Sequence, residues 1–253
     1  MLRPRAIPCL LLKNGRLVKT IRFDKPQYVG DPINAVRIFN DMEVDEIVVL
    51  DIGATPDRSA VRFDLIGEMA SECFMPMAYG GGLTSVEQVR RVLGLGVEKV
   101  VINSAAGQDL SIVRAVADAF GSQSIVASVD VRKRMFSGYR PYISGGRQAL
   151  KIDVTKWVQA LELAGAGEIL VTSIDRDGTM DGYDLELVRL VTGAVRVPVI
   201  AAGGAGSVDD IGAVVARGGA SAAAVGSLAV YQGKNRAVLI NFPTPAQLKA
   251  VLP

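Results

Sequence analysis

The 253-residue sequence contains no histidine, and this limits the chemistry that its side chains can perform. Ser-His and Cys-His nucleophilic catalysis are excluded. Most transition-metal sites are excluded too, because the two cysteines, Cys9 and Cys73, are far apart in the chain and cannot hold zinc alone. Acid–base chemistry must therefore come from Asp, Glu, Lys, Tyr or Cys. We expect neither a metal nor a cofactor.

Glycine-rich segments suited to phosphate binding follow two short apolar runs. Gly80–Gly82 comes after "MPMAY" and Gly203–Gly204 after "VPVIAA", and each precedes a helix-like stretch. Glycine lets backbone N–H groups approach an anion closely, and a helix N-terminus adds a favourable dipole. The turns "NSAA" at Asn103–Ala106 and "GSLA" at Gly226–Ala229 follow the next strand in each case. Tight turns alone explain many glycine runs, but a pair at equivalent places favours two phosphate sites.

Short β-rich runs and helix-like stretches alternate along the chain and would position these loops. Apolar strands without a polar face, each followed by a helix, indicate a parallel sheet covered by helices. The runs are Ala6–Leu12, Glu46–Asp51, Met75–Tyr79, Lys99–Asn103, Ser124–Asp130, Glu168–Thr172, Pro198–Ala201 and Ala222–Val225. Eight units in about 250 residues predict a single (β/α)₈ barrel domain over residues 1–253. An open doubly wound sheet is the main alternative.

An internal repeat supports the barrel. "DEIVVLDI" at Asp45–Ile52 matches "GEILVTSI" at Gly167–Ile174, and Met75–Val89 matches Val197–Ile211. Both matches have an offset of 122 residues, close to half the chain, which indicates two duplicated half barrels. In such barrels the loops after strands seven and eight often bind phosphate. The duplication then predicts a second site after strands three and four, so that one ligand with two phosphates could span the mouth.

Charge and hydropathy argue against nucleic acid and membranes as partners. The formal net charge is +2, and no uninterrupted stretch approaches the roughly 20 apolar residues of a membrane span. The basic segment "RKRMFSGYR" at Arg132–Arg140 is interpreted as a mobile loop rather than a nucleic-acid site. Both cysteines lie in apolar runs, typical of buried thiols in a reducing compartment, so we expect a cytoplasmic protein. We expect the tail to end in a short helix near Thr244–Val251.

Motifs along nearly the whole chain resemble the HisF family, the cyclase subunits of imidazole glycerol phosphate synthase. They include "IPCL", "GRLVK", "VGDP", "DEIVVLDI", "VEKVVINSAA", "FGSQSIV", "VPVIAAGGAG" and the long "GAGEILVTSIDRDGTMDGYD". The resemblance implies a barrel that takes ammonia from a partner glutaminase. Such a barrel uses the ammonia to split a bisphosphorylated ribulosyl intermediate into imidazole glycerol phosphate and an aminoimidazole ribonucleotide.

The resemblance also implies an ammonia gate at the bottom of the barrel, where the HisH-like glutaminase subunit would bind. Four charged residues fall at the matching positions: Arg5, Glu46, Lys99 and Glu168. Both signs are present, so mutual pairing could satisfy them in a confined place. The alternative is that they are ordinary solvated charges at strand starts.

One departure from the family concerns catalysis. The family uses two aspartates as general acid and base, at the ends of the first and fifth strands. Asp130 in "VASVDVRKR" matches the fifth-strand residue, although an aspartate there can also simply cap a loop. Leu11 in "CLLLKNGR" stands where the family usually reads Cys-Leu-Asp-Val. Leucine has no proton to give or take, and loss of one partner typically costs about 10²–10⁴-fold in rate.

Other polar residues near the strand ends match the family but do not fill the first-strand position. Asp51 ends the second strand, Asp177 and Gly178 are interpreted as ligand-binding residues, and Lys19 could hold an anion or act on a flexible loop. The residues expected to bind a phosphorylated ligand are Lys19, Asp51, Gly81, Gly82, Asn103, Ser104, Thr172, Asp177, Gly178, Gly203, Gly204, Gly226 and Ser227.

The leucine-rich first strand is similar to that of an offshoot of the family, the HisF-like glycosyl amidation-associated proteins found with bacterial surface-polysaccharide genes. That resemblance implies a barrel that pairs with a HisH-like glutaminase and supplies ammonia to a separate sugar amidotransferase, which converts an N-acetyl group into an acetamidino group. Two alternatives stay open: a true cyclase of histidine biosynthesis in which another group replaces the aspartate, and a non-catalytic partner that only activates a glutaminase. Whether the phosphate loops bind a ligand distinguishes the non-catalytic partner from the other two interpretations.

Overall fold

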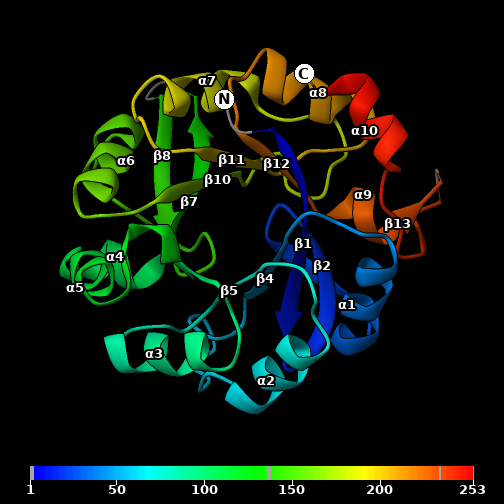
Figure 1. Cartoon of the computed structure of the whole chain (residues 1–253). Coiled ribbons are helices and arrows are strands. Elements are labelled where there is room, and N and C mark those ends of the chain that lie inside the picture. Colours follow the sequence, from blue (N-terminus) through cyan, green and yellow to red (C-terminus); the bar gives the residue numbers. More distant parts are fainter. Residues whose placement is uncertain (1–2, 136–137, 234, 253) are drawn as a thin grey trace.

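The structure, a computed structural model, describes residues 3–135, 138–233 and 235–252. Within these residues eight parallel strands form a closed ring (Figure 1). Around the ring they are β1 (Arg5–Lys13), β4 (Ile47–Asp51), β5 (Met77–Gly80), β6 (Lys99–Ile102), β7 (Ile125–Arg134), β10 (Glu168–Ser173), β11 (Val199–Ala202) and β12 (Ala222–Val225). Pairing of β7 with β10 closes the barrel. The predicted (β/α)₈ barrel is confirmed, and the open doubly wound sheet is wrong.

Helices surround the ring on its outside (Figure 1). They are α1 (Pro32–Asp41), α2 (Phe63–Ser71), α3 (Val86–Gly94), α4 (Ser104–Gln108), α5 (Ser111–Phe120), α6 (Val154–Leu163), α7 (Leu185–Thr192), α8 (Val208–Ala216), α9 (Ser227–Val230) and α10 (Pro245–Val251), with a 3₁₀ turn at Ser122–Ser124. The expected helix at the end of the tail is therefore present as α10. None of the helices among the described residues has the length and apolar character needed to cross a membrane.

The duplication seen in the sequence recurs in the elements. Strand β5 and helix α3 reappear as β11 and α8 at the same offset of 122 residues. The side chains of Ser85 and Ser207 cap these two helices in the same way, each accepting a hydrogen bond from the backbone N–H three residues later. The two halves of the barrel therefore place matching loops at matching points of its rim.

Two apolar layers hold the barrel together. The outer layer fills the space between the strands and the helices. The inner layer contains one side chain from each barrel strand and two from β12: Ile7, Val48, Ala78, Val101, Val126, Leu170, Ile200, Ala222 and Ala224. Successive side chains of a strand point to opposite faces, so each strand contributes to both layers. This explains the continuous apolar runs in the sequence.

Two antiparallel extensions rise from the barrel, and neither was predicted. Strands β2 (Arg16–Ile21) and β3 (Asp24–Gly30) continue from β1 as a hairpin. Strand β7 runs on to Arg134 and pairs with β8 (Gly138–Ile143), which pairs with β9 (Gln148–Ala149). Short strands β13 (Tyr231–Gln232) and β14 (Ala237–Val238) form a further pair in the tail.

The interpretation of Arg132–Arg140 as a mobile loop is wrong for the residues that the structure describes; residues 136–137 lie outside them. Arg132 and Arg140 are cross-strand partners in the hairpin. Tyr139 is buried, and its hydroxyl donates a hydrogen bond to Asp184, which caps α7, at 2.8 Å. The returning strand β8 alternates buried residues with more exposed ones, a strand pattern that the charge of the segment obscured.

Candidate functional site

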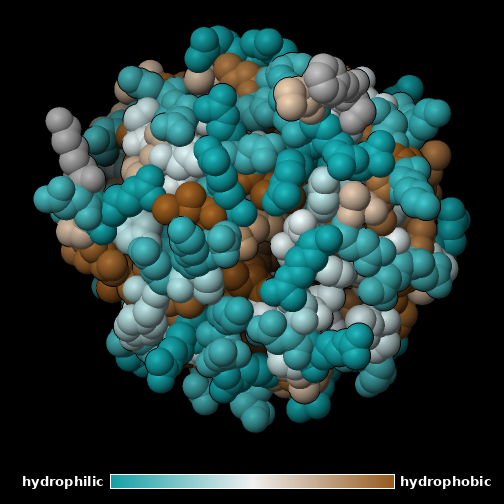
Figure 2. Space-filling view, turned by 180° about the vertical axis from the view of Figure 1, so that it is seen from behind, coloured by the Kyte–Doolittle hydropathy of each residue, from teal (hydrophilic) through white to brown (hydrophobic). Residues whose placement is uncertain are grey.

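The carboxyl ends of the barrel strands surround a cavity of about 330 Å³. Figure 2, seen from behind relative to Figure 1, shows hydrophilic side chains over most of that face and hydrophobic residues in a hollow near its centre. We call the cavity the mouth. Its lining includes Leu11 and Asp130 together with every residue expected to bind ligand: Lys19, Asp51, Gly81, Gly82, Asn103, Ser104, Thr172, Asp177, Gly178, Gly203, Gly204, Gly226 and Ser227.

Leu11 faces the mouth, whereas the leucines on either side of it do not. Leu10 and Leu12 are each 1% exposed and pack in the outer apolar layer. Leu11 is half-buried and lines the cavity, as the alternation of side chains along a strand requires. Its strand, β1, lies four places around the ring from β7, so Leu11 and Asp130 come from opposite sides of the barrel. The position of the missing aspartate thus points into the candidate site.

Asp130, like Asp51, is a buried carboxylate of the mouth that has no cationic partner among the described residues. It is 8% exposed and forms none of the ion pairs found there. The Asn103 side-chain amide donates a hydrogen bond to it at 2.7 Å. Burial raises the pKa of Asp130 to about 7, against the lowering effect of the Asn103 hydrogen bond. A carboxyl group with such a pKa can give or accept a proton near neutral pH.

Asp24, which also lines the mouth, is exposed. The other two buried carboxylates of the mouth are engaged in holding the fold. Asp51 accepts hydrogen bonds from the backbone N–H groups of Gly53 and Ala54, at 3.0 and 3.1 Å, and so caps the loop after β4. Burial raises the pKa of Asp51. Asp177 pairs with Lys19 at 2.8 Å and accepts a hydrogen bond from the Thr20 hydroxyl at 2.8 Å. Neither carboxylate takes the place of the first-strand aspartate.

The expectation that Lys19 acts on a flexible loop is wrong. Lys19 lies on β2, is 5% exposed and reaches Asp177 across the mouth. The backbone reinforces this contact, because the N–H of Arg22 donates to the carbonyl oxygen of Asp177 at 2.8 Å. Gly178 makes the approach possible: it has φ +73°, and a Cβ there would lie 2.2 Å from the Thr20 carbonyl oxygen. The sequence showed no sign that these two segments meet.

Two of the glycine loops that line the mouth require glycine for steric reasons. Gly81 and Gly203 have φ of +128° and +85°, and a Cβ on either would lie within 2.6 Å of a backbone carbonyl oxygen. These conformations favour glycine. Both loops line the mouth ahead of capped helices, α3 and α8. In addition, the hydroxyl of Ser227 is buried and has no hydrogen-bond partner among the described residues. An unpartnered buried donor facing a cavity fits an anionic ligand.

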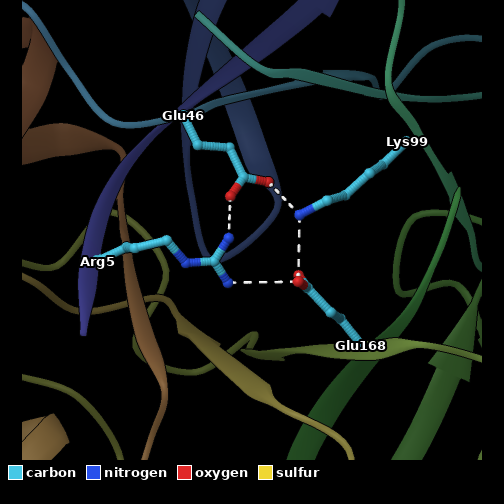
Figure 3. Close-up of polar contacts among 4 residues, drawn as sticks. All are labelled: Arg5, Glu46, Lys99 and Glu168. Atoms are coloured by element: carbon cyan, nitrogen blue, oxygen red, sulfur yellow. Dashed lines mark hydrogen bonds and ion pairs between the residues drawn. The ribbon is translucent and has the colours of Figure 1, made fainter. Parts of the chain in front are cut away.

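At the opposite end of the barrel, the four predicted gate residues meet in one ring (Figure 3). Arg5 pairs with Glu46 and, at 3.3 Å, with Glu168. Lys99 pairs with Glu46 at 3.0 Å and with Glu168 at 3.1 Å. Each residue starts a barrel strand or immediately precedes one. Glu46 is 2% exposed, so the alternative of ordinary solvated charges does not describe it. The inner apolar layer lies between this ring and the mouth.

The sequence analysis did not predict two residues that line the mouth, although they lie on the same strand faces as predicted residues. Cys9 and Ser128 line the mouth two positions before Leu11 and Asp130. Alternation along the strand was the signal that could have found them. Burial raises the pKa of Cys9 to about 12, so it is not an acid–base group near neutral pH. Both cysteines are free thiols, and they are half-buried rather than fully buried as expected.

Comparison with known proteins identifies relatives over almost the whole chain. The family model "Histidine biosynthesis protein" matches residues 5–236. "Putative imidazole glycerol phosphate synthase subunit hisF2" of Pseudomonas aeruginosa is 52% identical over 96% of this chain and 97% of its own length. "Putative imidazole glycerol phosphate synthase subunit hisF3" of Vibrio vulnificus is 46% identical over 100% of this chain and 97% of its own length. "Imidazole glycerol phosphate synthase subunit HisF" of Trichormus variabilis is 40% identical over 98% of both chains.

Proposed function

The chain belongs to the HisF family, and from this premise we propose that its barrel delivers ammonia rather than closing the imidazole ring. In this proposal a HisH-like glutaminase binds at the ring end, and ammonia passes through the barrel to a separate sugar amidotransferase. The product is an acetamidino sugar for surface polysaccharide such as O-antigen. The assembly would work in the cytoplasm, where glutamine is available.

The observation that carries the proposal is the side chain of Leu11 in the mouth opposite Asp130. Ring closure by the family's route needs one group that donates a proton and one that accepts it. Leucine does neither, and Asp51 and Asp177 are already bonded to the loop after β4 and to Lys19. A mouth in which leucine stands opposite Asp130 suits a passage for a small neutral molecule better than a two-carboxylate reaction.

The intact ring supports the ammonia part of the proposal. It keeps two cations and two anions in mutual contact beneath an apolar interior. Removing charges from water costs up to several kcal/mol per ion before pairing, on the order of what the pairs regain, and here Glu46 is buried and the other three are partly buried. Such a ring is therefore weak as a stabilising device. Its retention is better explained by a role at the entrance of the barrel.

The cyclase of histidine biosynthesis is the alternative, and two features favour it. Both pairs of glycine loops line the mouth, and the hydroxyl of Ser227 is free to bind an anion. Asp130, with its pKa near 7, can serve as one of the two acid–base groups. In this alternative the chain is a cyclase, and a water molecule or a shifted side chain performs the proton transfer of the missing aspartate.

The first test is cyclase turnover with the bisphosphorylated ribulosyl intermediate and a high concentration of ammonium salt, which removes the need for a partner. We expect none from the wild-type protein. Leu11→Asp is expected to gain about 10²–10⁴-fold over the wild-type background, because it restores the acid–base pair. Leu11→Asn is the matched control: it has the shape and polarity of aspartate but does not titrate, and is expected to gain nothing. Wild-type turnover at the rate of an ordinary cyclase would overturn the proposal.

A second arm tests delivery directly. The wild-type barrel, the HisH-like glutaminase and the sugar amidotransferase encoded in the same genome are combined with ¹⁵N-amide glutamine and an N-acetylated sugar. The proposal predicts ¹⁵N in the acetamidino product only when the barrel is present. Equal incorporation without the barrel, at low free ammonium, would contradict it.

A further inference from the structure

The inward-facing side chains of β1 stay apolar from the inner layer of the barrel up to the mouth. In order from the ring end, the alternate positions of this strand hold Arg5, Ile7, Cys9 and Leu11. Arg5 belongs to the charged ring, Ile7 belongs to the inner apolar layer, and Cys9 and Leu11 line the mouth. Alternate side chains of a strand share one face, so these four lie on one line through the barrel. After Arg5, the three side chains on this line carry no charge.

The strands beside β1 continue this apolar surface. Leu50 of β4 is the register partner of Leu11, so the two side chains lie on the same face of the sheet. Cys9, Leu50 and Ala202 of β11 pack against the inner apolar layer, to which Ala224 of β12 belongs. Four neighbouring strands, β11, β12, β1 and β4, therefore carry one apolar surface from the inner layer to the mouth. We call the following residues the apolar side of the mouth: Cys9, Leu11, Leu50, Ala202 and Ala224.

The other side of the mouth is polar. Asn103 directly follows β6, Ser128 and Asp130 lie on β7, and Thr172 lies on β10. All four line the mouth, and their three strands are neighbours in the ring. On β7 the inward-facing residue is apolar in the inner layer, at Val126, and polar from Ser128 onward. The mouth is therefore divided into a polar and an apolar side, and Leu11 stands on the apolar one.

Two charged groups close to the apolar side are engaged by other residues. The Asp51 carboxylate accepts hydrogen bonds from backbone N–H groups of the loop after β4. The ammonium group of Lys19 reaches Asp177 at 2.8 Å, whereas the Cε methylene of Lys19 lies 3.0 Å from the point where a Cβ on Gly226 would be. Burial raises the pKa of Cys9 to about 12, so its thiol is neutral at physiological pH. The apolar side therefore has no charge of its own.

Such a surface discriminates between the two protonation states of ammonia. Ammonia in water near neutral pH is mostly protonated, and only the neutral molecule has the lone pair that attacks a carbon centre. Moving an ammonium ion into apolar surroundings without a partner costs far more free energy than moving a neutral polar molecule there. An apolar wall also offers water few hydrogen-bond partners, and apolar cavities tend to stay dry. Ammonia that keeps to this surface therefore stays neutral.

We propose that ammonia leaves the barrel along the apolar side of the mouth, and that Leu11 keeps it neutral and unhydrated as far as the rim. Leu11 is half-buried and forms the outer end of the inward line of β1. An aspartate at this position would place a charge and its bound water in the last step of the path. Leucine thus completes the path and determines the form in which nitrogen is delivered. This inference rests on the proposed function, because it concerns the exit of the ammonia assumed there.

The test is a competition between two sources of nitrogen. The full-length barrel, the glutaminase and the sugar amidotransferase of the same genome receive ¹⁵N-amide glutamine, an N-acetylated sugar and unlabelled ammonium chloride. Mass spectrometry gives the ratio of labelled to unlabelled nitrogen in the acetamidino product, taken at equal glutamate release so that it reports escape of ammonia. Leu11→Asn is expected to lower this ratio about fivefold, the factor of one net hydrogen bond from the new amide to ammonia or water. Leu11→Met, which stays apolar, is expected to retain the wild-type ratio.

The two cysteines supply an independent pair of variants. Cys9→Ser places a hydroxyl on the inward line of β1, two residues before Leu11, and is expected to lower the ratio as well. Cys73→Ser is the matched control. Cys73 is also a half-buried free thiol, but it packs against the outer apolar layer, so the ratio should stay at the wild-type value. Urea unfolding of each variant shows whether it is folded under the conditions of the competition.

The outcomes separate this inference from the proposed function. A wild-type complex whose product contains no nitrogen from glutamine would overturn the proposed function, and the exit path with it. A wild-type complex that delivers labelled nitrogen, with Leu11→Asn at the same ratio, would overturn the exit path alone. In that case any side chain of this size would serve at position 11. Equal ratios for Cys9→Ser and Cys73→Ser would contradict a path along β1.

Discussion

Glu46 at the ring end and Asp130 at the mouth are both buried carboxylates, but within the described residues Glu46 has cationic partners and Asp130 has none. At the ring end, Glu46 and Glu168 each contact both Arg5 and Lys99. At the mouth, Asp130 accepts a hydrogen bond from the neutral amide of Asn103 at 2.7 Å, and Leu11 stands opposite. The same burial that pairing offsets at the ring end raises the pKa of Asp130 at the mouth.

The difference between the ends teaches where the function of the barrel has been kept. At the ring end, four side chains of balanced charge pair with one another. At the mouth, the proposed acid–base pair would have Asp130 as its one member, because Leu11 stands at the other position. An ammonia conduit needs the first and not the second, whereas a cyclase needs both. The predictions below change one end at a time, beginning with the largest expected effect.

The free energy of unfolding of the wild type should fall relative to that of Asp130→Asn as the pH rises. A pKa raised from 3.8 to about 7 means that the folded state holds a proton which the unfolded state has lost. Wild-type stability should therefore fall progressively from about pH 4 to pH 7, by up to about 4 kcal/mol relative to the variant. Urea unfolding at pH 4 and pH 8 measures this. Asp153→Asn is a control of opposite sign, because the pKa of Asp153 is lowered. A pH-independent difference would show that Asp130 ionises freely.

Glu46→Gln should destabilise the ring end by about 3 kcal/mol, because it replaces the buried carboxylate and leaves two partly buried cations to share Glu168. Urea unfolding at pH 7 gives the value. The exposed pair Lys133–Glu186 offers the control, and Glu186→Gln should cost less than about 1 kcal/mol. Equal losses for the two variants would mean that the ring is no more than a set of surface charges.

Lys19→Met should cost about 2 kcal/mol, because Asp177 loses a charged donor but keeps the hydroxyl of Thr20. The exposed pair of Lys13 with Asp57 is the comparison, and Lys13→Met should change stability little. Amide hydrogen exchange should also quicken in the β2–β3 hairpin of Lys19→Met. An unchanged rate of amide exchange in the hairpin would show that contacts other than the Lys19–Asp177 ion pair hold it in place.

Ser227→Ala should change stability by less than about 1 kcal/mol, since the hydroxyl that it removes is buried without a partner. It should nevertheless weaken binding of inorganic phosphate, measured by calorimetry. Ser104→Ala is the matched control: the Ser104 hydroxyl accepts a hydrogen bond from Ser144 at 2.9 Å, so its loss should lower stability. If Ser227→Ala binds phosphate as tightly as the wild type, the Ser227 hydroxyl does not take part in phosphate binding.

Much of the mouth was predictable because parallel strands end at one rim. Once the runs ending at Asp51 and Asp130 are recognised as parallel strands, their last residues must share that rim. The hairpins were not predictable in this way. Arg16–Ile21 and Gly138–Ile143 carry charged residues at positions that a barrel strand would fill with apolar ones. They become strands because they pair with β1 and β7, which the local sequence does not encode.

The sequence by itself determined the duplicated barrel, the rim that collects the glycine loops, and the replacement of a carboxylate by Leu11. Hydrophobic periodicity and internal repeats can be recognised in the sequence without knowledge of any tertiary contact. Only the tertiary structure decided that Lys19 pairs with Asp177, and that Asp130 has no counter-ion within the part of the chain that the structure describes. Partners of this kind come from segments far apart in the chain, and closure of the barrel alone brings them within hydrogen-bonding distance.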